Sequence, residues 1–309
     1  NNATKTFALG KTTILWIATD KAGNTANATQ TVDVVDTTAP KIIAPKNIVV
    51  NATSATDNHV DIGNATVSDA VKVVSLTNNA PSVFPFGNTT VTWTATDEAG
   101  NKQTSTQVIQ VVDRTPPNLI IPSDIVINAT AFTTPVTLGQ ATATGIIDTS
   151  PKITNNATSQ FPIGKSIVEW KAIDKFGNTK TMTQTVSVLA CGKPESAYNL
   201  IMGTTGDDTL TGSVVPNLII GLSGNDIIHA GPAGDCIIAG NGDNIILGGN
   251  GNDIIIAGDG NNVIKTGSGN EQIHVGDGSN IIQGGTGHNT CYLGNPSKDT
   301  VVNCESKLQ

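Results

Sequence analysis

One position in the C-terminal third of the chain carries acidic or amide side chains every nine residues. Between residues 203 and 292 the sixth residue of each nine-residue unit is an acid or an asparagine. The acidic members are Asp208, Asp226, Asp235, Asp253 and Glu271. Turns repeating at this interval bring these carboxylates into register, where they repel each other unless a cation lies between them. Carboxylate and carbonyl oxygens suit Ca²⁺, so the pattern predicts calcium sites.

Glycine-rich turns and very short strands must position this column. Each unit has a six-residue turn and a three-residue strand, and only the middle residue of such a strand points inward. That eighth position is Ile in nearly every unit, from Ile219 to Ile282. These few side chains bury too little apolar surface to order 90 residues on their own. We therefore predict that folding of this segment is partly coupled to Ca²⁺.

The nine-residue units resemble the calcium-binding nonapeptide G-G-x-G-x-D-x-U-x of RTX proteins. The units "GLSGNDIIH" and "GGNGNDIII" fit best, whereas "GSVVPNLII" and "AGPAGDCII" are degenerate. The resemblance implies a parallel β-roll in which successive units alternate between two facing sheets. It pairs Asp208 with Asp226, Asp235 with Asp253, and Asp253 with Glu271. Units with asparagine at the sixth position, such as Asn262, Asn280 and Asn289, are expected to stand without metal.

The charge distribution agrees with a cation as partner. Residues 203–292 hold nine acidic side chains and one basic side chain, Lys265, which accounts for all the excess negative charge of the chain. This excess argues against nucleic-acid binding by that segment. No apolar run approaches the length of a membrane span, and any signal peptide has been removed or lies outside the sequence.

A longer repeat fills the first 190 residues. Trp16, Trp93 and Trp170 are spaced 77 residues apart, and each lies in an alternating stretch that ends at Asp-x-x-Gly-Asn. This pattern predicts a strand, a tight turn and a second strand within a two-sheet sandwich. The stretches "FGNTTVTWTATDEAGN" and "IGKSIVEWKAIDKFGN" resemble hyalin repeat (HYR) modules, which implies an immunoglobulin-like fold and extracellular adhesion.

The predicted fold class is therefore all-β, with tandem immunoglobulin-like sandwiches before a β-roll. The predicted domains are a partial module at 1–36, modules at 37–113 and 114–190, a linker or cap at 191–202, the roll at 203–292, and a cap at 293–309. The partial module is expected to be a fragment of a longer array, or to be completed by strands from another chain.

The acids at the module boundaries are a second set of candidate ligands. We expect Asp97 to approach Asp36, and Asp174 to approach Asp113, so that each pair could bind Ca²⁺ between modules. The alternative, which the sequence favours, is that an Asp that opens a turn stabilises that turn locally without metal.

Cysteines and glycosylation sequons indicate an exported chain. We pair Cys191 with Cys236 and Cys291 with Cys304 as clamps at the two ends of the roll. The Asn-x-Ser/Thr sequons, all before the acidic repeat, are Asn2, Asn27, Asn51, Asn64, Asn88, Asn128 and Asn156.

Outward positions of the roll are unusually apolar. One patch lies on the even-numbered units and one stripe on the odd-numbered units, and we expect at least one of them to contact the third sandwich or another chain. The residues are Leu218, Ile220, Cys236, Ile238, Ile254 and Ile256 in the patch, and Ile227, Ile245, Val263 and Ile281 in the stripe. The alternative is that β-branched residues merely favour strands.

No nucleophile, base and acid are grouped in the sequence. The four histidines, His59, His229, His274 and His288, are scattered and are expected to lie on the surface. The leading hypothesis is a non-enzymatic, calcium-stabilised extracellular protein of an adhesive array, filament or sheath that self-assembles or contacts other surface proteins or glycans. The alternative is a protein that binds glycans or ice on a flat face of the roll.

Overall fold

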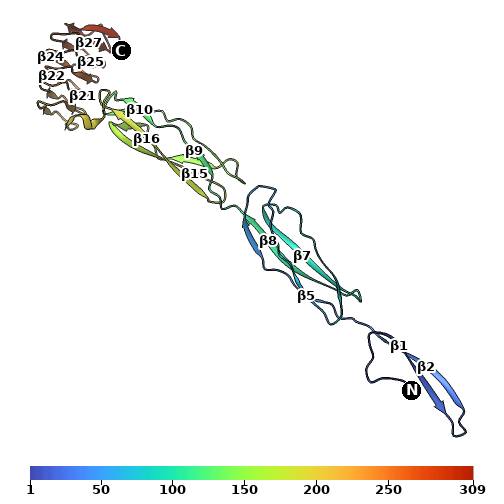
Figure 1. Cartoon of the computed structure of the whole chain (residues 1–309). Helices are drawn as coiled ribbons and strands as arrows, with labels where there is room; N and C mark the ends of the chain where they lie inside the picture. Colours follow the sequence, from blue (N-terminus) through green and yellow to red (C-terminus); the bar gives the residue numbers. More distant parts are fainter. Residues whose placement is uncertain (309) are drawn as a thin grey trace. The chain divides into compact units, whose positions relative to one another are not determined.

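The computed structural model describes residues 1–308 and confirms an all-β chain, whose one helical element is a 3-10 turn at Glu195–Ala197. Within these residues no helix is both long and apolar enough to cross a membrane. Contacts group the chain into two units. The first holds residues 1–117 with the loops 144–150 and 174–178, and the second holds the remaining residues (Figure 1).

The first unit begins with a hairpin. Strands β1 (Gly10–Thr19) and β2 (Thr25–Val34) pair antiparallel over their whole length. Leu9, Trp16 and Ile17 are exposed, with Trp16 at 46%, because among the described residues no second sheet packs on the hairpin.

A sandwich follows the hairpin. Its strands are β3 (Lys41–Ile43), β4 (Ile48–Asn51), β5 (Thr66–Ser68), β6 (Val73–Asn78), β7 (Gly87–Asp97) and β8 (Lys102–Val112). One sheet has the order β4-β8-β7-β6, and β3 pairs with β5 in the other. Alternating residues of β7 and β8 point inward, so Trp93 and Ile109 lie in the core, at 4% and 0% exposure.

The second unit contains a sandwich of the same plan. Its strands are β9 (Asn118–Ile120), β10 (Ile125–Asn128), β11 (Thr133–Pro135), β12 (Thr142–Thr144), β13 (Lys152–Asn155), β14 (Gln160–Pro162), β15 (Gly164–Ile173) and β16 (Thr179–Leu189). The main sheet has the order β10-β16-β15-β13, with Trp170 on its buried face.

A tryptophan–glutamine pair recurs in the core of both sandwiches. The indole nitrogen of Trp93 donates to Gln107 Oε1 at 3.3 Å, and Trp170 donates to Gln184 Oε1 at 3.0 Å. The amide nitrogen of Gln107 also donates to the carbonyls of Lys46 and Ile62, at 2.9 and 3.0 Å. The glutamine therefore ties the central strands to two loops that the sheets do not reach.

Substituting Gln107→Leu should destabilise the first sandwich by about 3 kcal/mol, because three buried polar groups lose their partner. Urea unfolding followed by tryptophan fluorescence measures this. Gln103→Leu, at an exposed position of the same strand, is the control and should stay within about 0.5 kcal/mol of the parent. Equal stability of the two variants would refute the role given to Gln107.

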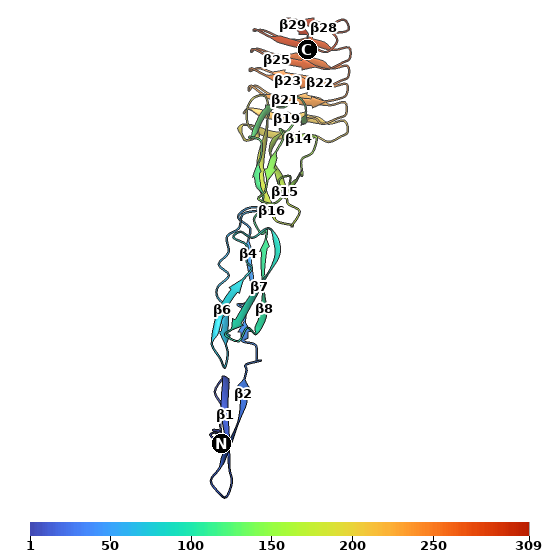
Figure 2. The ribbon, with the colours of Figure 1, turned by 90° about the vertical axis from the view of Figure 1, so that its right-hand side faces the viewer.

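Two facing parallel sheets form the rest of the second unit, as the resemblance to RTX repeats implies (Figure 2). The larger sheet contains β17 (Asn199–Met202), β19 (Asn217–Ile220), β21 (Cys236–Gly240), β23 (Ile254–Ala257), β25 (Gln272–Val275), β27 (Thr290–Leu293) and β29 (Glu305–Leu308). The smaller contains β18 (Thr209–Thr211), β20 (Ile227–His229), β22 (Ile245–Gly249), β24 (Val263–Thr266), β26 (Ile281–Gln283) and β28 (Thr300–Val302).

The eighth positions of the units form one continuous core between these sheets. Ile219, Ile237 and Ile255 from one sheet and Ile228 and Ile246 from the other are all fully buried. Residues one repeat of 18 apart pair directly, as Ile237 does with Ile255. The sheets extend beyond residues 203–292 at both ends, since β17 precedes that range and β28 and β29 follow it.

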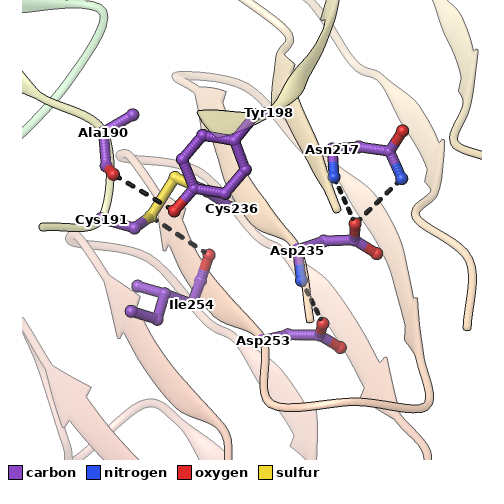
Figure 3. The surroundings of a disulfide bond; sticks show 8 residues. All are labelled: Ala190, Cys191, Tyr198, Asn217, Asp235, Cys236, Asp253 and Ile254. Atoms are coloured by element: carbon purple, nitrogen blue, oxygen red, sulfur yellow. Dashed lines mark hydrogen bonds between the residues drawn. A yellow bond between two sulfur atoms is a disulfide. The ribbon is translucent and has the colours of Figure 1, made fainter. Parts of the chain in front are cut away.

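Two disulfides lie at the ends of the roll. Cys191 is bonded to Cys236, which joins the end of the second sandwich to the larger sheet (Figure 3). Cys291 is bonded to Cys304. The loops that they close differ in length, with sequence separations of 45 and 13 residues. A longer loop loses more unfolded-state entropy when closed, so the first bond restricts the unfolded chain more than the second.

Candidate metal centre

Sixth-position side chains form two ladders, one along each edge of the roll. At most steps the backbone N–H of one sixth-position residue donates to the side-chain oxygen of the residue 18 further on, but Glu271 accepts no such bond from Asp253 and the last step, to Asp299, is 19 residues. Asp208 donates in this way to Asp226 Oδ1 at 2.9 Å, and Asp235 to Asp253 Oδ1 at 2.9 Å. The first ladder contains Asp208, Asp226, Asn244, Asn262, Asn280 and Asp299, and the second contains Asn217, Asp235, Asp253, Glu271 and Asn289.

The second oxygen of most of these acids has no partner. Asp226, Asp235 and Asp253 are 0%, 2% and 0% exposed, and the Oδ2 atom of each is buried without a hydrogen bond. Both carboxylate oxygens of Glu271 are likewise buried without a hydrogen bond. An ionised carboxylate cannot be buried at low cost unless a cation or a donor compensates it. The acids therefore fit a bound cation, and the orphaned oxygens mark where it would bind.

Burial dominates the electrostatics of this cluster. It raises the pKa values of Asp226, Asp235 and Glu271, and it raises the pKa of Asp253 to about 8. The neighbouring charges of Asp235 and Glu271 contribute to this rise of the pKa of Asp253, although less than burial does. Without a cation the folded roll therefore favours protonated acids.

Acidification should stabilise the calcium-free roll. A pKa that is higher in the folded state contributes stability that is fully present below the unfolded value, near 4, and is lost as pH rises through the folded value, about 8 for Asp253. In EGTA, the melting temperature at pH 5 should exceed that at pH 8 by about 5 °C or more. Circular dichroism melts check this, and a melting temperature that falls on acidification in EGTA would contradict it.

Glycines let the turns approach the acids closely. A Cβ on Gly221 would lie 2.4 Å from Asp226 Oδ2, and one on Gly248 would lie 2.8 Å from Asp253 Oδ2. Real Cβ atoms do not come so near, so these positions exclude any side chain. Glycine thus opens the units of Asp226 and Asp253, whereas Ala230 and Thr266 open those of Asp235 and Glu271, whose acids are as deeply buried.

Asp208 and Asp299 differ from the sequence-based expectation. Asp208 is partly exposed, and its Oδ2 accepts hydrogen bonds from the backbone and hydroxyl of Thr204, at 2.6 and 2.9 Å. The predicted Asp208–Asp226 pair therefore has one orphaned oxygen, on Asp226. Asp299 extends the first ladder by accepting from Asn280, and the sequence analysis missed it because its spacing is 19 residues rather than 18.

Asp97 and Asp174, at the module boundaries, accept hydrogen bonds from their own turns. Asp97 accepts from the backbone of Asn101 at 2.8 Å and from its side chain at 2.8 Å, and Asp174 accepts identically from Asn178. Burial opposes ionisation of Asp97 and Asp174, but these hydrogen bonds outweigh it and hold both pKa values below the usual range. The alternative of local turn stabilisation thus accounts for both acids.

The two boundaries differ in how their acids gather. Carboxylate oxygens of Asp36, Asp69 and Asp97 lie within 4.8 Å of one another, and the sequence analysis did not include Asp69. Around Asp113 and Asp174 the described residues contain no equivalent group of three acids. An asparagine bridges the acids at both boundaries: Asn178 donates to the carbonyl of Asp113 and to Asp174 Oδ2, as Asn101 does to the carbonyl of Asp36 and to Asp97 Oδ2.

The patch of the predicted assembly surface is largely covered by the chain itself. Leu218, Ile220, Cys236 and Ile238 are at most 1% exposed and belong to the same core as Trp170. The expectation that one apolar region packs on the third sandwich is therefore met, and these side chains are not available to another molecule. Ile254 and Ile256 are half-buried beside them.

The stripe on the smaller sheet faces solvent. Ile227, Ile245, Val263 and Ile281 are 39%, 44%, 41% and 52% exposed. They lie at adjacent register positions in β20, β22, β24 and β26, so they form a continuous aliphatic column.

Sequons and histidines give less information. The side chain of Asn51 donates to Thr115 Oγ1 and accepts from the backbone of Arg114, at 2.8 and 2.7 Å. Glycosylation of this and the other sequons stays a prediction. Among the histidines, His274 is half-buried and stacks on Tyr292 with ring centroids 4.3 Å apart, contrary to the expected surface position.

Profiles of known families match one module of the 77-residue repeat and most of the nine-residue repeat. A profile of the HYR domain matches residues 35–111, and the RTX calcium-binding nonapeptide repeat matches in four copies, at 199–214, 216–246, 233–264 and 265–295. The chain therefore contains an HYR domain and RTX repeats.

Relatives cover the chain in part. Hyalin of Lytechinus variegatus is 31% identical over 204 residues, which are 59% of this chain and 37% of that protein. Hyalin of Strongylocentrotus purpuratus is 32% identical over 199 residues, 59% of this chain and 16% of that protein. A serine-rich adhesin for platelets of Staphylococcus aureus is 31% identical over 110 residues, 32% of this chain and 5% of that protein. The chain thus spans well under half of each relative.

Solved structures give only distant likenesses. The immunoglobulin domains 1–5 of Sidekick-1 share 13% identity at a TM-score of 0.29, covering 65% of this chain and 50% of that one. Protocadherin Gamma C5 EC1-3 shares 13% identity at a TM-score of 0.27, covering 57% of this chain and 77% of that one.

Proposed function

We propose that this chain, which joins HYR-type sandwiches to RTX calcium-binding repeats, is a non-enzymatic extracellular protein whose roll is stabilised by Ca²⁺ and which serves adhesion or assembly at a cell surface. The HYR and RTX matches and the hyalin and adhesin relatives support this class. Two disulfides fit an oxidising compartment.

The observation that carries the calcium proposal is the set of buried oxygens without partners. Oδ2 of Asp226, Asp235 and Asp253 and the carboxylate of Glu271 would hold the ions. Bound Ca²⁺ would supply the positive charge that these acids lack inside the roll. The chain itself holds the three aspartates in place through the N–H that donates to the other oxygen of each, as Asn217 does for Asp235.

The calcium proposal is confined to the roll. Asp97 and Asp174 already use both carboxylate oxygens for hydrogen bonds to their own turns. Asp36 and Asp113 each leave one buried oxygen unpaired, but Asp97 and Asp174 have no unpaired oxygen to complete a site with it.

Isothermal titration with Ca²⁺ tests this proposal. The intact chain should bind two or more ions, and the variant with Asp226→Ala, Asp235→Ala and Asp253→Ala should bind fewer. A parent chain that binds no Ca²⁺ would refute the assignment. Aggregation of beads coated with the chain, with and without Ca²⁺, tests the adhesive role, and beads that stay dispersed in both conditions would count against it.

A second candidate function is ligand binding on the smaller sheet. The exposed column of Ile227, Ile245, Val263 and Ile281 gives this face a regular apolar surface. The ligand would be a glycan or ice. Ice fits this face less well, because an aliphatic column has no hydroxyl groups to hydrogen-bond ordered water. Binding on a glycan array that Ile245→Asp abolishes would favour this function over assembly.

A further inference from the structure

We propose that asparagine at the sixth position takes the place of the cation, so that the roll consists of coils that need Ca²⁺ and coils that fold without it. The inference rests on the proposed calcium binding for the acidic coils. For the asparagine coils it rests on hydrogen bonds within the roll.

The amide group of Asn244 binds the turn that precedes it. Its Nδ2 donates to the carbonyls of Gly240 and Gly242, at 3.4 and 3.1 Å, and to Asn262 Oδ1 at 3.0 Å. Its Oδ1 accepts from the N–H of Asp226 at 3.0 Å. Both ends of this fully buried side chain are therefore satisfied by protein atoms alone.

Other asparagines repeat the arrangement. Nδ2 of Asn262 donates to the carbonyls of Gly258 and Gly260, at 3.3 and 3.2 Å. Nδ2 of Asn217 donates to those of Ser213 and Val215, at 3.3 and 2.7 Å. In each coil the partners are the carbonyls four and two residues earlier, so the amide closes its own turn.

An aspartate at this position cannot make those bonds. Its Oδ2 replaces the Nδ2 of asparagine in an almost identical shape, but an ionised carboxylate has no hydrogen to donate. The unpartnered Oδ2 atoms of Asp226, Asp235 and Asp253 match this expectation. Figure 3 shows Asp235 and Asp253. By the repeat, the carbonyls that an amide would bind beside Asp253 are those of Gly249 and Gly251. A carboxylate beside these carbonyls therefore needs a cation, because all of the atoms are acceptors. An amide beside them donates hydrogen bonds to the carbonyls and needs no further partner.

The two kinds of coil are segregated along the roll. In the first ladder, Asn244, Asn262 and Asn280 follow Asp226 without another acid until Asp299. In the second ladder, the acids Asp235, Asp253 and Glu271 are contiguous between Asn217 and Asn289. Calcium demand is thus concentrated between residues 226 and 271, with one further acid, Asp299, at the end of the first ladder, and that ladder is metal-independent from Asn244 to Asn280.

Substitution at Asp253 tests this inference. Asp253→Asn should remove one bound Ca²⁺ in titration and should raise the melting temperature in EGTA by about 5 °C. Asp253→Ala removes the charge without supplying the amide, so it should melt below Asp253→Asn in EGTA. Asp243→Asn, at an exposed position of a neighbouring turn, is the matched control and should change neither quantity.

The outcomes separate this inference from the calcium proposal. If Asp253→Asn melts no higher in EGTA than Asp253→Ala or the parent, the amide does not replace the ion and the inference fails. If the parent binds no Ca²⁺ but Asp253→Asn is still stabilised in EGTA, the calcium proposal fails while the role of the amide stands. The reverse substitution, Asn262→Asp, should lower the melting temperature in EGTA, and an unchanged value would also count against the inference.

Discussion

Removing Ca²⁺ with EGTA at pH 8 should lower the melting temperature of the roll by about 10 °C or more and should leave the sandwich at residues 37–113 unaffected. Five acids of the roll, Asp226, Asp235, Asp253, Glu271 and Asp299, have carboxylate oxygens that are buried without hydrogen bonds. An uncompensated buried charge costs several kcal/mol, so the apo roll must protonate these acids or open. Far-ultraviolet circular dichroism with and without chelator measures the loss.

The chain provides an internal reference for this experiment. Trp16 and Trp93 lie in the first unit, whereas Trp170 belongs to the core that the second sandwich shares with the larger sheet, so the fluorescence of a Trp170→Phe variant reports on the first unit alone. Re-addition of Ca²⁺ should restore the dichroism signal, whereas Mg²⁺ should not, because it dehydrates reluctantly and requires a stricter geometry. A melting curve that is the same in EGTA and in Ca²⁺ would contradict the prediction.

Leu218→Asp should destabilise the second unit by about 4 kcal/mol and uncouple its sandwich from the roll. Leu218 is fully buried in the core that also contains Trp170 and Val188. A carboxylate at this position would be buried without a partner, in addition to the loss of apolar contacts. Denaturant unfolding monitored by both fluorescence and dichroism should change from one shared transition to two.

Ile245→Asp is the matched control for this substitution. Ile245 has the same place in its nine-residue unit, but it lies on the smaller sheet and is 44% exposed. The cost there should be about 1 kcal/mol or less. Equal destabilisation by the two substitutions would mean that the larger sheet does not pack on the sandwich as described.

Much of the fold could be predicted from the period of the sequence. Nine-residue units with Ile at the eighth position allow one inward side chain for each strand, and the core from Ile219 to Ile282 follows from that rule. The 77-residue period placed Trp93 and Trp170 in sandwich cores in the same way. These features depend on local geometry repeated many times, so the pattern alone determines them.

Other features depend on tertiary placement, which no periodicity encodes. Leu218 and Ile227 have the same place in their units, yet one is buried by the sandwich and the other is 39% exposed. The sequence likewise predicted that units with asparagine at the sixth position stand without metal, but not all the bonds that take the place of the ion. The hydrogen bonds from the asparagine amides to the carbonyls of the turns, which the aspartates cannot make, became visible only in the structure.

Anomalous difference density from crystals of the intact chain grown in calcium chloride tests the central claim most directly. The account predicts peaks at about 2.3–2.6 Å from Oδ2 of Asp226, Asp235 and Asp253, and none beside Asn244 or Asn262. Intact sheets with no anomalous density at any of the three acids would contradict it.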